Sequence, residues 1–114
     1  MQSLPNGCLK VLDKDIDDNS NFIIRLNSEN IKLPLHVRTK KQGDKILIKN
    51  MNNKKKVKEI FIECKLNNNE RKVWPIVTDD NDEIIWIPGL KKSNLDVKKS
   101  NKYDIIIKYN LKER

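Results

Sequence analysis

Seven short apolar runs, each bounded by polar residues, constrain the fold of this chain more than any other feature of its sequence. They are rich in Ile, Val and Leu, and several alternate apolar with polar residues, which is typical of β-strands. Clusters of Asp, Asn, Gly and Lys separate them, as expected of turns and hairpin loops. The predicted strands are residues 8–13, 21–27, 31–38, 45–49, 73–77, 83–88 and 104–109.

Residues 54–65 have a helical period instead. Val57, Ile60, Phe61 and Cys64 are spaced three or four residues apart, which predicts a short amphipathic helix with Asn52 or Asn53 as its cap. A further helical turn is expected at residues 70–72. Prolines inside two of the strand runs, Pro34 and Pro75, indicate edges, bends or strand starts. We therefore expect a mainly β domain of the α+β class, sandwich-like or barrel-like, with one or two short helices.

The size and composition bound the class of protein. A chain of 114 residues is one domain by the usual size range, and 37% hydrophobic with 35% charged residues still allows one modest core. No run approaches the roughly 20 apolar residues of a membrane helix, and the first ten residues lack a signal-peptide core. We expect a soluble cytoplasmic domain without a membrane partner, in which Cys8 and Cys64 stay reduced.

Familiar catalytic and metal-binding motifs are missing from the sequence. The glycines are isolated, which excludes a phosphate-binding loop, and no Cys-x-x-Cys pair is present for zinc. The Asp13-x-Asp15-x-Asp17 run resembles the opening of a calcium loop but lacks its glycine and its last glutamate, so a solvated loop is favoured. His36 is expected to be an ordinary strand residue, and the acidic cluster at 79–83 a charged turn. We expect no catalytic residue, metal or cofactor in this segment.

Basic residues dominate the polar surface, and their net charge of +8 favours an anionic partner such as nucleic acid. The abundance of Lys, Asn and Ile together also fits an AT-rich coding bias, so clustering is more informative than number. Both tryptophans, Trp74 and Trp86, lie inside strand runs and are expected in the core. A structured RNA read through its shape and backbone fits better than stacked single strands.

Three stretches of the sequence, taken in their order along the chain, resemble the pattern of a known protein family. The first has an arginine shortly before Gly-Asp in a basic turn, and the second has a lysine-rich helix and an arginine four residues before a proline. The third is a strand ending in Trp-x-x-Gly with a basic residue beyond it. The matching residues are Arg38, Gly43, Asp44, Lys54, Lys55, Lys56, Lys58, Arg71, Pro75, Trp86, Gly89 and Lys91.

This combination, over about residues 31–95, resembles the C-terminal domain of bacterial tRNA(Ile)-lysidine synthetase. The resemblance implies a module similar to one in the phenylalanyl-tRNA synthetase β-chain, and it implies that the domain holds the minor isoleucine tRNA, with the acceptor stem as the contact. The family enzyme is a tRNA-modifying ligase that uses ATP, with Mg²⁺, to attach lysine to the wobble cytidine. That chemistry belongs to an N-terminal ATP-pyrophosphatase domain that this chain lacks. Lys91 stands where the family has Arg, and a lysine cannot make the bidentate contacts that an arginine makes with phosphate.

The sequence therefore predicts one tRNA-binding domain over residues 1–114. Its partners would be tRNA(Ile), the catalytic domain of the same enzyme, and a second copy in a homodimer. Two other functions stay open, namely a scaffold or dimerisation domain that binds no RNA, and a stand-alone RNA-binding module. We expect Pro88 and Gly89 to turn the chain so that basic residues line a common rim. The predicted tRNA-binding residues are Arg38, Lys40, Lys41, Lys54, Lys55, Lys56, Lys58, Arg71, Lys91 and Lys92.

Overall fold

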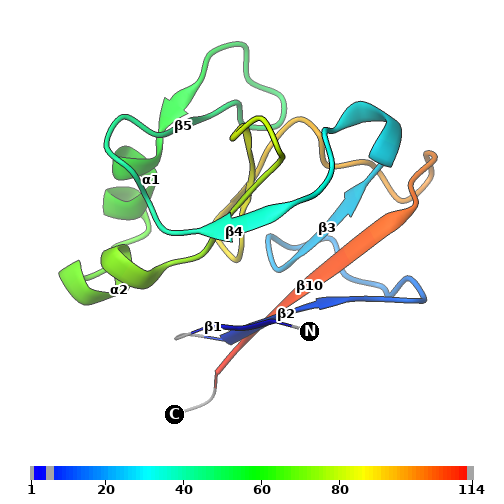
Figure 1. Ribbon diagram of the computed structural model, residues 1–114, viewed down its shortest axis with the longest axis horizontal. Coiled ribbons are helices and arrows are strands. Elements are labelled where there is room, and N and C mark those ends of the chain that lie inside the picture. The colour runs from blue at the N-terminus through cyan, green and yellow to red at the C-terminus, as the bar shows by residue number, and fades with distance from the viewer. Residues whose placement is uncertain (1, 5–6, 113–114) are drawn as a thin grey trace.

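The computed structural model describes residues 2–4 and 7–112 of the chain. Two antiparallel sheets of four strands and one of two strands make up its β-structure, with the helices at one side (Figure 1). The first sheet has the order β1-β2-β10-β3, and the second has the order β4-β7-β8-β9. The strands are β1 Gln2–Leu4, β2 Gly7–Val11, β3 Ile23–Leu26, β4 His36–Arg38, β5 Lys45–Ile46, β6 Lys55–Lys56, β7 Ile76–Thr78, β8 Ile84–Ile87, β9 Lys91–Lys92 and β10 Ile105–Leu111.

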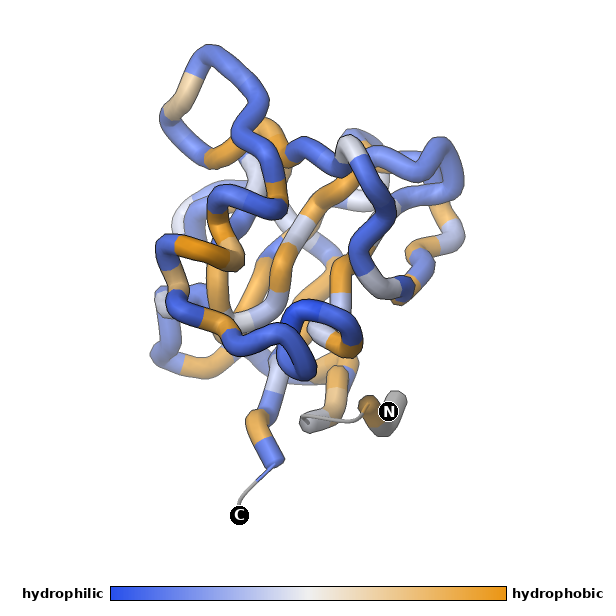
Figure 2. The backbone as a smooth tube through the Cα atoms, turned by 90° about the vertical axis from the view of Figure 1, so that its left-hand side faces the viewer, coloured by the Kyte–Doolittle hydropathy of each residue, from blue (hydrophilic) through white to orange (hydrophobic). Residues whose placement is uncertain are grey.

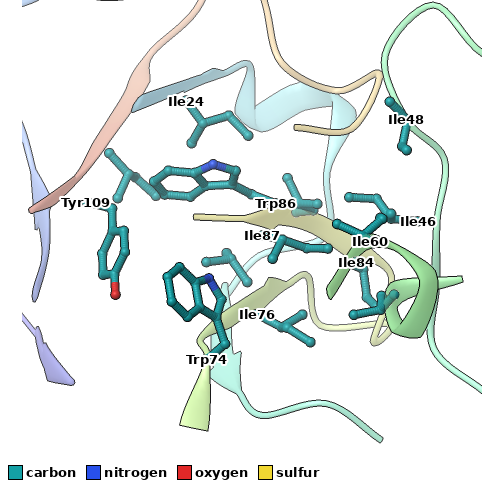
Figure 3. Packing of buried hydrophobic residues seen from close by; sticks show 14 of the residues in the cluster. Ile24, Ile46, Ile48, Ile60, Trp74, Ile76, Ile84, Trp86, Ile87 and Tyr109 are labelled. Atoms are coloured by element: carbon teal, nitrogen blue, oxygen red, sulfur yellow. The ribbon is translucent and has the colours of Figure 1, made fainter. Parts of the chain in front are cut away.

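Both four-strand sheets contribute to one hydrophobic core. Trp86 is fully buried beside Ile24 and Tyr109, while Ile46, Ile60 and Ile84 lie at the other end of the cluster (Figure 3). Polar residues occupy most outer loops, and apolar segments run through the interior (Figure 2). The predicted mainly β fold with short helices is confirmed, and so is the burial of both tryptophans.

Strands β3, β7 and β8 are buried more completely than the alternating pattern predicted. All four residues of β3 and all four of β8 are buried, as are the three of β7. A strand that is covered on both faces carries a continuous apolar run, which is what Ile84–Ile87 shows. The short runs of Ile and Val therefore mark interior strands between packed layers.

Two predicted strands begin later than expected. The chain bends at Leu33 and Pro34, whose peptide bond is cis, and β4 starts only at His36. Val73 belongs to a helix, and Trp74 after it takes the extended conformation that a following proline imposes, so β7 starts just beyond Pro75. Both prolines thus stand next to strand starts, as their placement indicated.

The first helix, α1 (Val57–Glu63), buries Val57, Ile60 and Phe61 as its apolar spacing predicted. The prediction that Lys54, Lys55, Lys56 and Lys58 open this helix is right only for Lys58, because Lys55 and Lys56 form β6 and pair with β5. The prediction of an asparagine cap was also wrong. Lys56 occupies the cap position and its side chain makes no capping hydrogen bond.

The second helix, α2 (Asn68–Val73), is longer than the single turn predicted. Asn67 accepts a hydrogen bond from the backbone N–H of Glu70, and the Glu70 side chain accepts one from the N–H of Asn67. This capping box satisfies two amides that would otherwise lack partners. A 3-10 turn, η1 (Ser28–Asn30), follows β3, and the Asn27 side chain caps it by accepting from the N–H of Glu29.

The turn after β8 is held at several points by the segment before β3. Gly89 donates its N–H to the carbonyl oxygen of Asn21 at 2.8 Å, and Trp86 Nε1 donates to the same oxygen at 2.9 Å. Pro88 is buried, and its carbonyl accepts a hydrogen bond from Trp74 Nε1. Gly89 adopts a φ of +79°, and a Cβ there would lie 3.0 Å from the Phe22 ring. This turn needs glycine for its backbone and for its close approach to Phe22.

We expect Gly89→Ala to destabilise the domain more than Gly43→Ala does. Both glycines have positive φ, but a Cβ at Gly43 would meet nothing within 4 Å. The backbone conformation alone costs about 1–2 kcal/mol for a residue with a Cβ, and displacing the Phe22 ring adds on the order of 1 kcal/mol. Urea unfolding of both variants measures the difference. Equal losses of stability would contradict a role for the Phe22 contact.

Candidate nucleic-acid interface

Arg38, at the end of β4, holds the basic turn that follows it. Its Nη1 donates to Asp44 Oδ2 at 2.8 Å, its Nη2 donates to Asp44 Oδ1 at 3.0 Å, and its Nε donates to Asp82 Oδ1 at 2.9 Å. These bonds raise the pKa of Arg38, the Asp44 bond most. Burial acts to raise the pKa of Asp44, but bonds from Arg38 and from the N–H of Lys41 outweigh it and lower that pKa. The Arg38 side chain is only 16% exposed, so its guanidinium is committed to holding this turn.

Lys41 and Lys54 meet the hairpin between β7 and β8. Lys54 Nζ lies 3.4 Å from Glu83 Oε1, and Lys41 Nζ lies 3.9 Å from Asp82 Oδ2. Asp79, at the start of this hairpin, is buried and accepts hydrogen bonds from two backbone amides of the turn. The acidic cluster is therefore a charged turn, as predicted. The structure brings Arg38, Lys41 and Lys54 together, but it pairs them with carboxylates.

The remaining lysines of this region differ in their exposure and in whether they pair with a carboxylate. Lys55 donates to both oxygens of Glu63 on α1, whereas Lys56 and Lys58 are exposed. Lys40 is half-buried and favours the ionised form of Asp44 through its charge. Within residues 2–4 and 7–112, no ion pair is formed by Lys40, Lys56 or Lys58. These three keep their positive charge available.

Arg71 and the pair Lys91–Lys92 lie in other parts of the fold. Arg71 Nε donates to the carbonyl oxygen of Leu66 at the junction of the two helices. Lys91 and Lys92 form β9, at the edge of the sheet opposite to β4 and Arg38. Lys92 lies 3.3 Å from Asp96 Oδ2. The predicted residues thus occupy a hairpin group, the helix junction and the β9 edge, and their union in one tRNA-facing rim stays a prediction.

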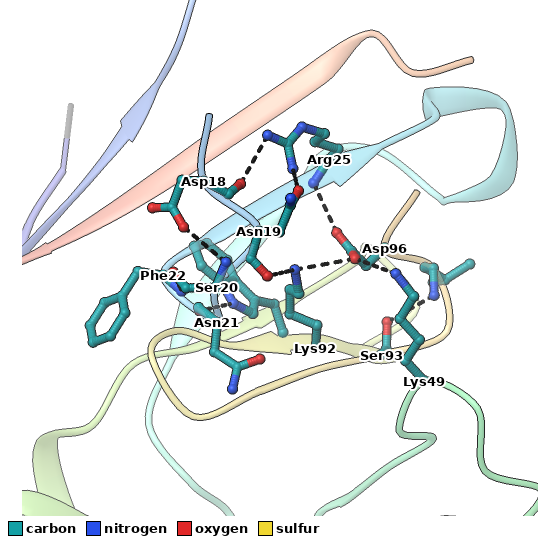
Figure 4. Close-up of polar contacts among 12 residues, drawn as sticks. Asp18, Asn19, Ser20, Asn21, Phe22, Arg25, Lys49, Lys92, Ser93 and Asp96 are labelled. Atoms are coloured by element: carbon teal, nitrogen blue, oxygen red, sulfur yellow. Dashed lines mark hydrogen bonds and ion pairs between the residues drawn. The ribbon is translucent and has the colours of Figure 1, made fainter. Parts of the chain in front are cut away.

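A second basic group surrounds the β9 edge, and of its members only Lys92 belongs to the predicted tRNA-binding set. Lys49 Nζ lies 2.7 Å from Asp96 Oδ2, beside Lys92, and the Arg25 N–H donates to Asp96 Oδ1 at 3.2 Å (Figure 4). Asp96 is buried, with 3% of its side chain exposed. A cleft of about 410 Å³ opens here. Its lining residues are Asn19, Arg25, Lys49, Lys92, Asp96, Val97, Lys98, Lys99 and Ser100.

The loop expected to be solvated is in fact tied to the core. Asp15 accepts hydrogen bonds from the buried Arg25 and from the Tyr103 hydroxyl, and the Arg25 bond contributes most to lowering the pKa of Asp15. Asp18 pairs with Lys108 on β10, which is the main cause of its own lowered pKa. The loop is therefore a structural clamp. Its acidic residues gave no sign of this in sequence, because their partners lie up to 90 residues away.

The structure also shows the environments of the single histidine and of the two cysteines. His36 lies on β4 as an exposed strand residue, with Nε2 3.0 Å from Asp80 Oδ1. Cys8 and Cys64 are half-buried free thiols. Among the residues described, no group of three His, Cys, Asp or Glu side chains is arranged to hold a metal ion. Over the same residues, no helix is both long and apolar enough to cross a membrane.

A mainly β fold with one core, two short helices and a lysine-rich surface places the chain in the class of small basic α+β domains. Within that class it belongs to the family described as TilS substrate C-terminal domain, whose sequence profile matches residues 35–106. The resemblance drawn from the residue pattern is thereby confirmed.

Relatives and a solved structure agree with this assignment. The chain is 44% identical over 115 residues to a tRNA(Ile)-lysidine synthase of Bacillus subtilis (strain 168), covering 97% of this chain and 24% of that protein. It is 46% identical over 93 residues to the tRNA(Ile)-lysidine synthase of Oceanobacillus iheyensis, covering 79% of this chain and 20% of that one. A crystal structure of a TILS C-terminal domain superimposes with a TM-score of 0.84 at 34% identity, covering 97% of this chain and 89% of that chain. The chain thus spans a fifth to a quarter of these curated relatives' length.

Proposed function

We propose that this domain binds the minor isoleucine tRNA for a tRNA(Ile)-lysidine synthase and positions it through the acceptor stem. The observation that carries the proposal is the net charge of +8 on a domain of the TilS substrate C-terminal family. Lysines that are not paired with a carboxylate bind the phosphates of a nucleic acid through their charge, so such binding needs no base-specific contact.

The parent enzyme would supply the chemistry from its other domains. There, ATP with Mg²⁺ and free lysine would modify the wobble cytidine, and a catalytic ATP-pyrophosphatase domain would be the covalent neighbour of this one. Cytoplasmic location and assembly into a homodimer belong to the same proposal. The role of the present segment, residues 1–114, would be to hold the substrate.

Fluorescence anisotropy with labelled isoleucine tRNA at several salt concentrations tests this function. We expect log Kd to rise linearly with log salt concentration, because bound phosphates release counterions. The variant Lys40→Gln/Lys56→Gln/Lys58→Gln removes three lysines that make no ion pair in the described part of the chain. It is expected to weaken binding about tenfold and to reduce the salt slope by roughly one for each phosphate that the variant no longer neutralises.

A matched control separates local contacts from total charge. Lys10, Lys14 and Lys32 are exposed and lie outside the predicted set, so changing all three to Gln removes the same charge. If the control weakens tRNA binding as much as the first variant, the predicted residues form no local site. If neither the variant nor the parent chain binds tRNA at low salt, the scaffold or dimerisation function takes the place of this proposal.

A further inference from the structure

The cleft beside β9 gathers positive charge from several separate segments. Arg25 lies on β3, Lys49 follows β5, and Lys92 lies on β9, while Lys98 and Lys99 belong to the turn before β10. Five cations and one carboxylate therefore line one cleft. The Arg25 guanidinium is neutralised by Asp15, so the surplus comes from the four lysines.

The buried Asp96 fixes two of these lysines in place. Lys49 and Lys92 converge on the same oxygen, Asp96 Oδ2, at 2.7 Å and 3.3 Å, so two ammonium groups share one negative charge (Figure 4). An ammonium group has three donors. Among the described residues, Lys49 donates one hydrogen bond, to Asp96. Lys92 contacts Asp96 and, at 3.4 Å, the carbonyl oxygen of Asn19. Donors held in position and left unused favour an incoming anion, because little side-chain entropy remains to be lost.

The rim of the cleft adds further donors and little opposing charge. Lys98, Lys99 and Ser100 are all exposed, and Lys99 Nζ donates to the uncharged carbonyl oxygen of Ile16 at 3.1 Å. At about 30 Å³ for each water molecule, a cleft of about 410 Å³ has room for a phosphate group with part of its hydration shell. The opening is polar, which suits a hydrated ligand.

We propose that this cleft is a phosphate-binding site, anchored by Lys49 and Lys92 and closed by Lys98, Lys99 and the Ser100 hydroxyl. A tetrahedral phosphate offers acceptor oxygens to ammonium and hydroxyl donors coming from several directions. The phosphate belongs either to a nucleic acid or to a free ion. The inference rests on the proposed tRNA binding only for the nucleic-acid source.

The test follows amide chemical shifts of the ¹⁵N-labelled chain during titration with inorganic phosphate at constant ionic strength, with sulfate in parallel. We expect saturable phosphate shifts confined to Lys49, Ser93 and residues 97–100. Lys98→Gln/Lys99→Gln is expected to raise the Kd for phosphate about tenfold, because two solvent-exposed charge contacts are removed, each of which contributes little on its own. Both side chains are exposed, so the fold is not at risk. The control Lys10→Gln/Lys14→Gln, which lies outside the cleft, is expected to leave this Kd unchanged.

A short RNA duplex, with and without a 5′-phosphate, distinguishes the two sources. RNA that shifts the same amides assigns the cleft to nucleic-acid phosphate, and shifts with inorganic phosphate alone assign it to a free ion. Shifts spread over all exposed lysines, equal in phosphate and sulfate, would overturn the site even if anisotropy shows tRNA bound elsewhere. Shifts confined to the cleft without any tRNA binding would overturn the proposed function and leave the phosphate site standing.

Discussion

Replacing Arg25 with Met is expected to lower the free energy of unfolding by roughly 3–5 kcal/mol, because it removes a buried side chain that hydrogen-bonds several acceptors, at about 1 kcal/mol for each bond. Arg25 is 2% exposed and donates to Asp15, to Asn19 Oδ1 and to the carbonyl oxygens of Ile16 and Asp18. Methionine fills most of the volume but donates no hydrogen bond, so each acceptor loses its bond from Arg25, although Asp15 keeps the Tyr103 hydroxyl and the Ile16 carbonyl keeps Lys99. Since total stabilities are about 5–15 kcal/mol, the loss is large. Chemical denaturation by urea measures it.

The pH dependence of stability distinguishes the loss of the Arg25–Asp15 ion pair from a loss of side-chain packing. The Arg25 bond is the main cause that lowers the pKa of Asp15 below its ordinary 3.8. A carboxyl with a lowered folded pKa contributes stability above its unfolded pKa, and this contribution is lost as the pH falls below about 4. The difference in stability between the parent chain and Arg25→Met should therefore shrink on acidification. A difference that stays constant from about pH 6 to about pH 2 would contradict the pairing, because that window spans the titration of an ordinary Asp.

The matched variant Asp15→Asn tests the same pair from the other side. It leaves the Arg25 guanidinium buried with carbonyl and amide acceptors but without its anion. The double variant Arg25→Met/Asp15→Asn should then lose less stability than the sum of the two single variants, because each single change already breaks the same ion pair. Additive losses would mean that the two residues act independently.

Sequence patterns predicted the strands and the helix that are determined by the apolar spacing of neighbouring residues. Short apolar runs identified β2, β3, β8 and β10, and the i, i+3, i+4 stripe identified α1, because burial of side chains fixes those patterns. The capping box of α2 was also present in the sequence. Asn67 followed three residues later by Glu70 is a recognised start signal, but only a single helical turn at residues 70–72 was predicted there. The family pattern over residues 31–95 predicted the fold class correctly.

Errors in the prediction arose where pairing between distant segments decides the structure. Lys55 and Lys56 form a strand only because β5 is there to pair with them, and two-residue strands carry no period of their own. Asp96 binds Lys49 across 47 positions of sequence, so the cleft beside β9 could not be found from linear clusters of charge. Arg38 matched the family pattern, but only the structure showed that Asp44 and Asp82 occupy its guanidinium. Clusters of lysine predict where charge is, whereas the structure shows which charges are already paired.

Trp86→Ala is expected to cost roughly 3–5 kcal/mol of unfolding free energy, the range for deleting a large side chain from a packed core. Trp86 is fully buried in the core beside Ile24 and Tyr109 (Figure 3). Its Nε1 donates to the carbonyl oxygen of Asn21. Alanine would leave a cavity between the two four-strand sheets, at the place where they share the core. Thermal and urea unfolding measure the loss.

Trp86→Phe separates packing from hydrogen bonding at this position. Phenylalanine keeps most of the buried ring and loses the Nε1 donor, while the Asn21 carbonyl still accepts the N–H of Gly89 at 2.8 Å. Because that oxygen keeps one partner, the loss should be smaller, on the order of 1–2 kcal/mol. If Trp86→Phe destabilises the domain as much as Trp86→Ala, the hydrogen bond to Asn21 dominates and the cavity argument fails. If the alanine variant costs far more, packing of the indole ring between the two sheets is the larger contribution of Trp86 to stability.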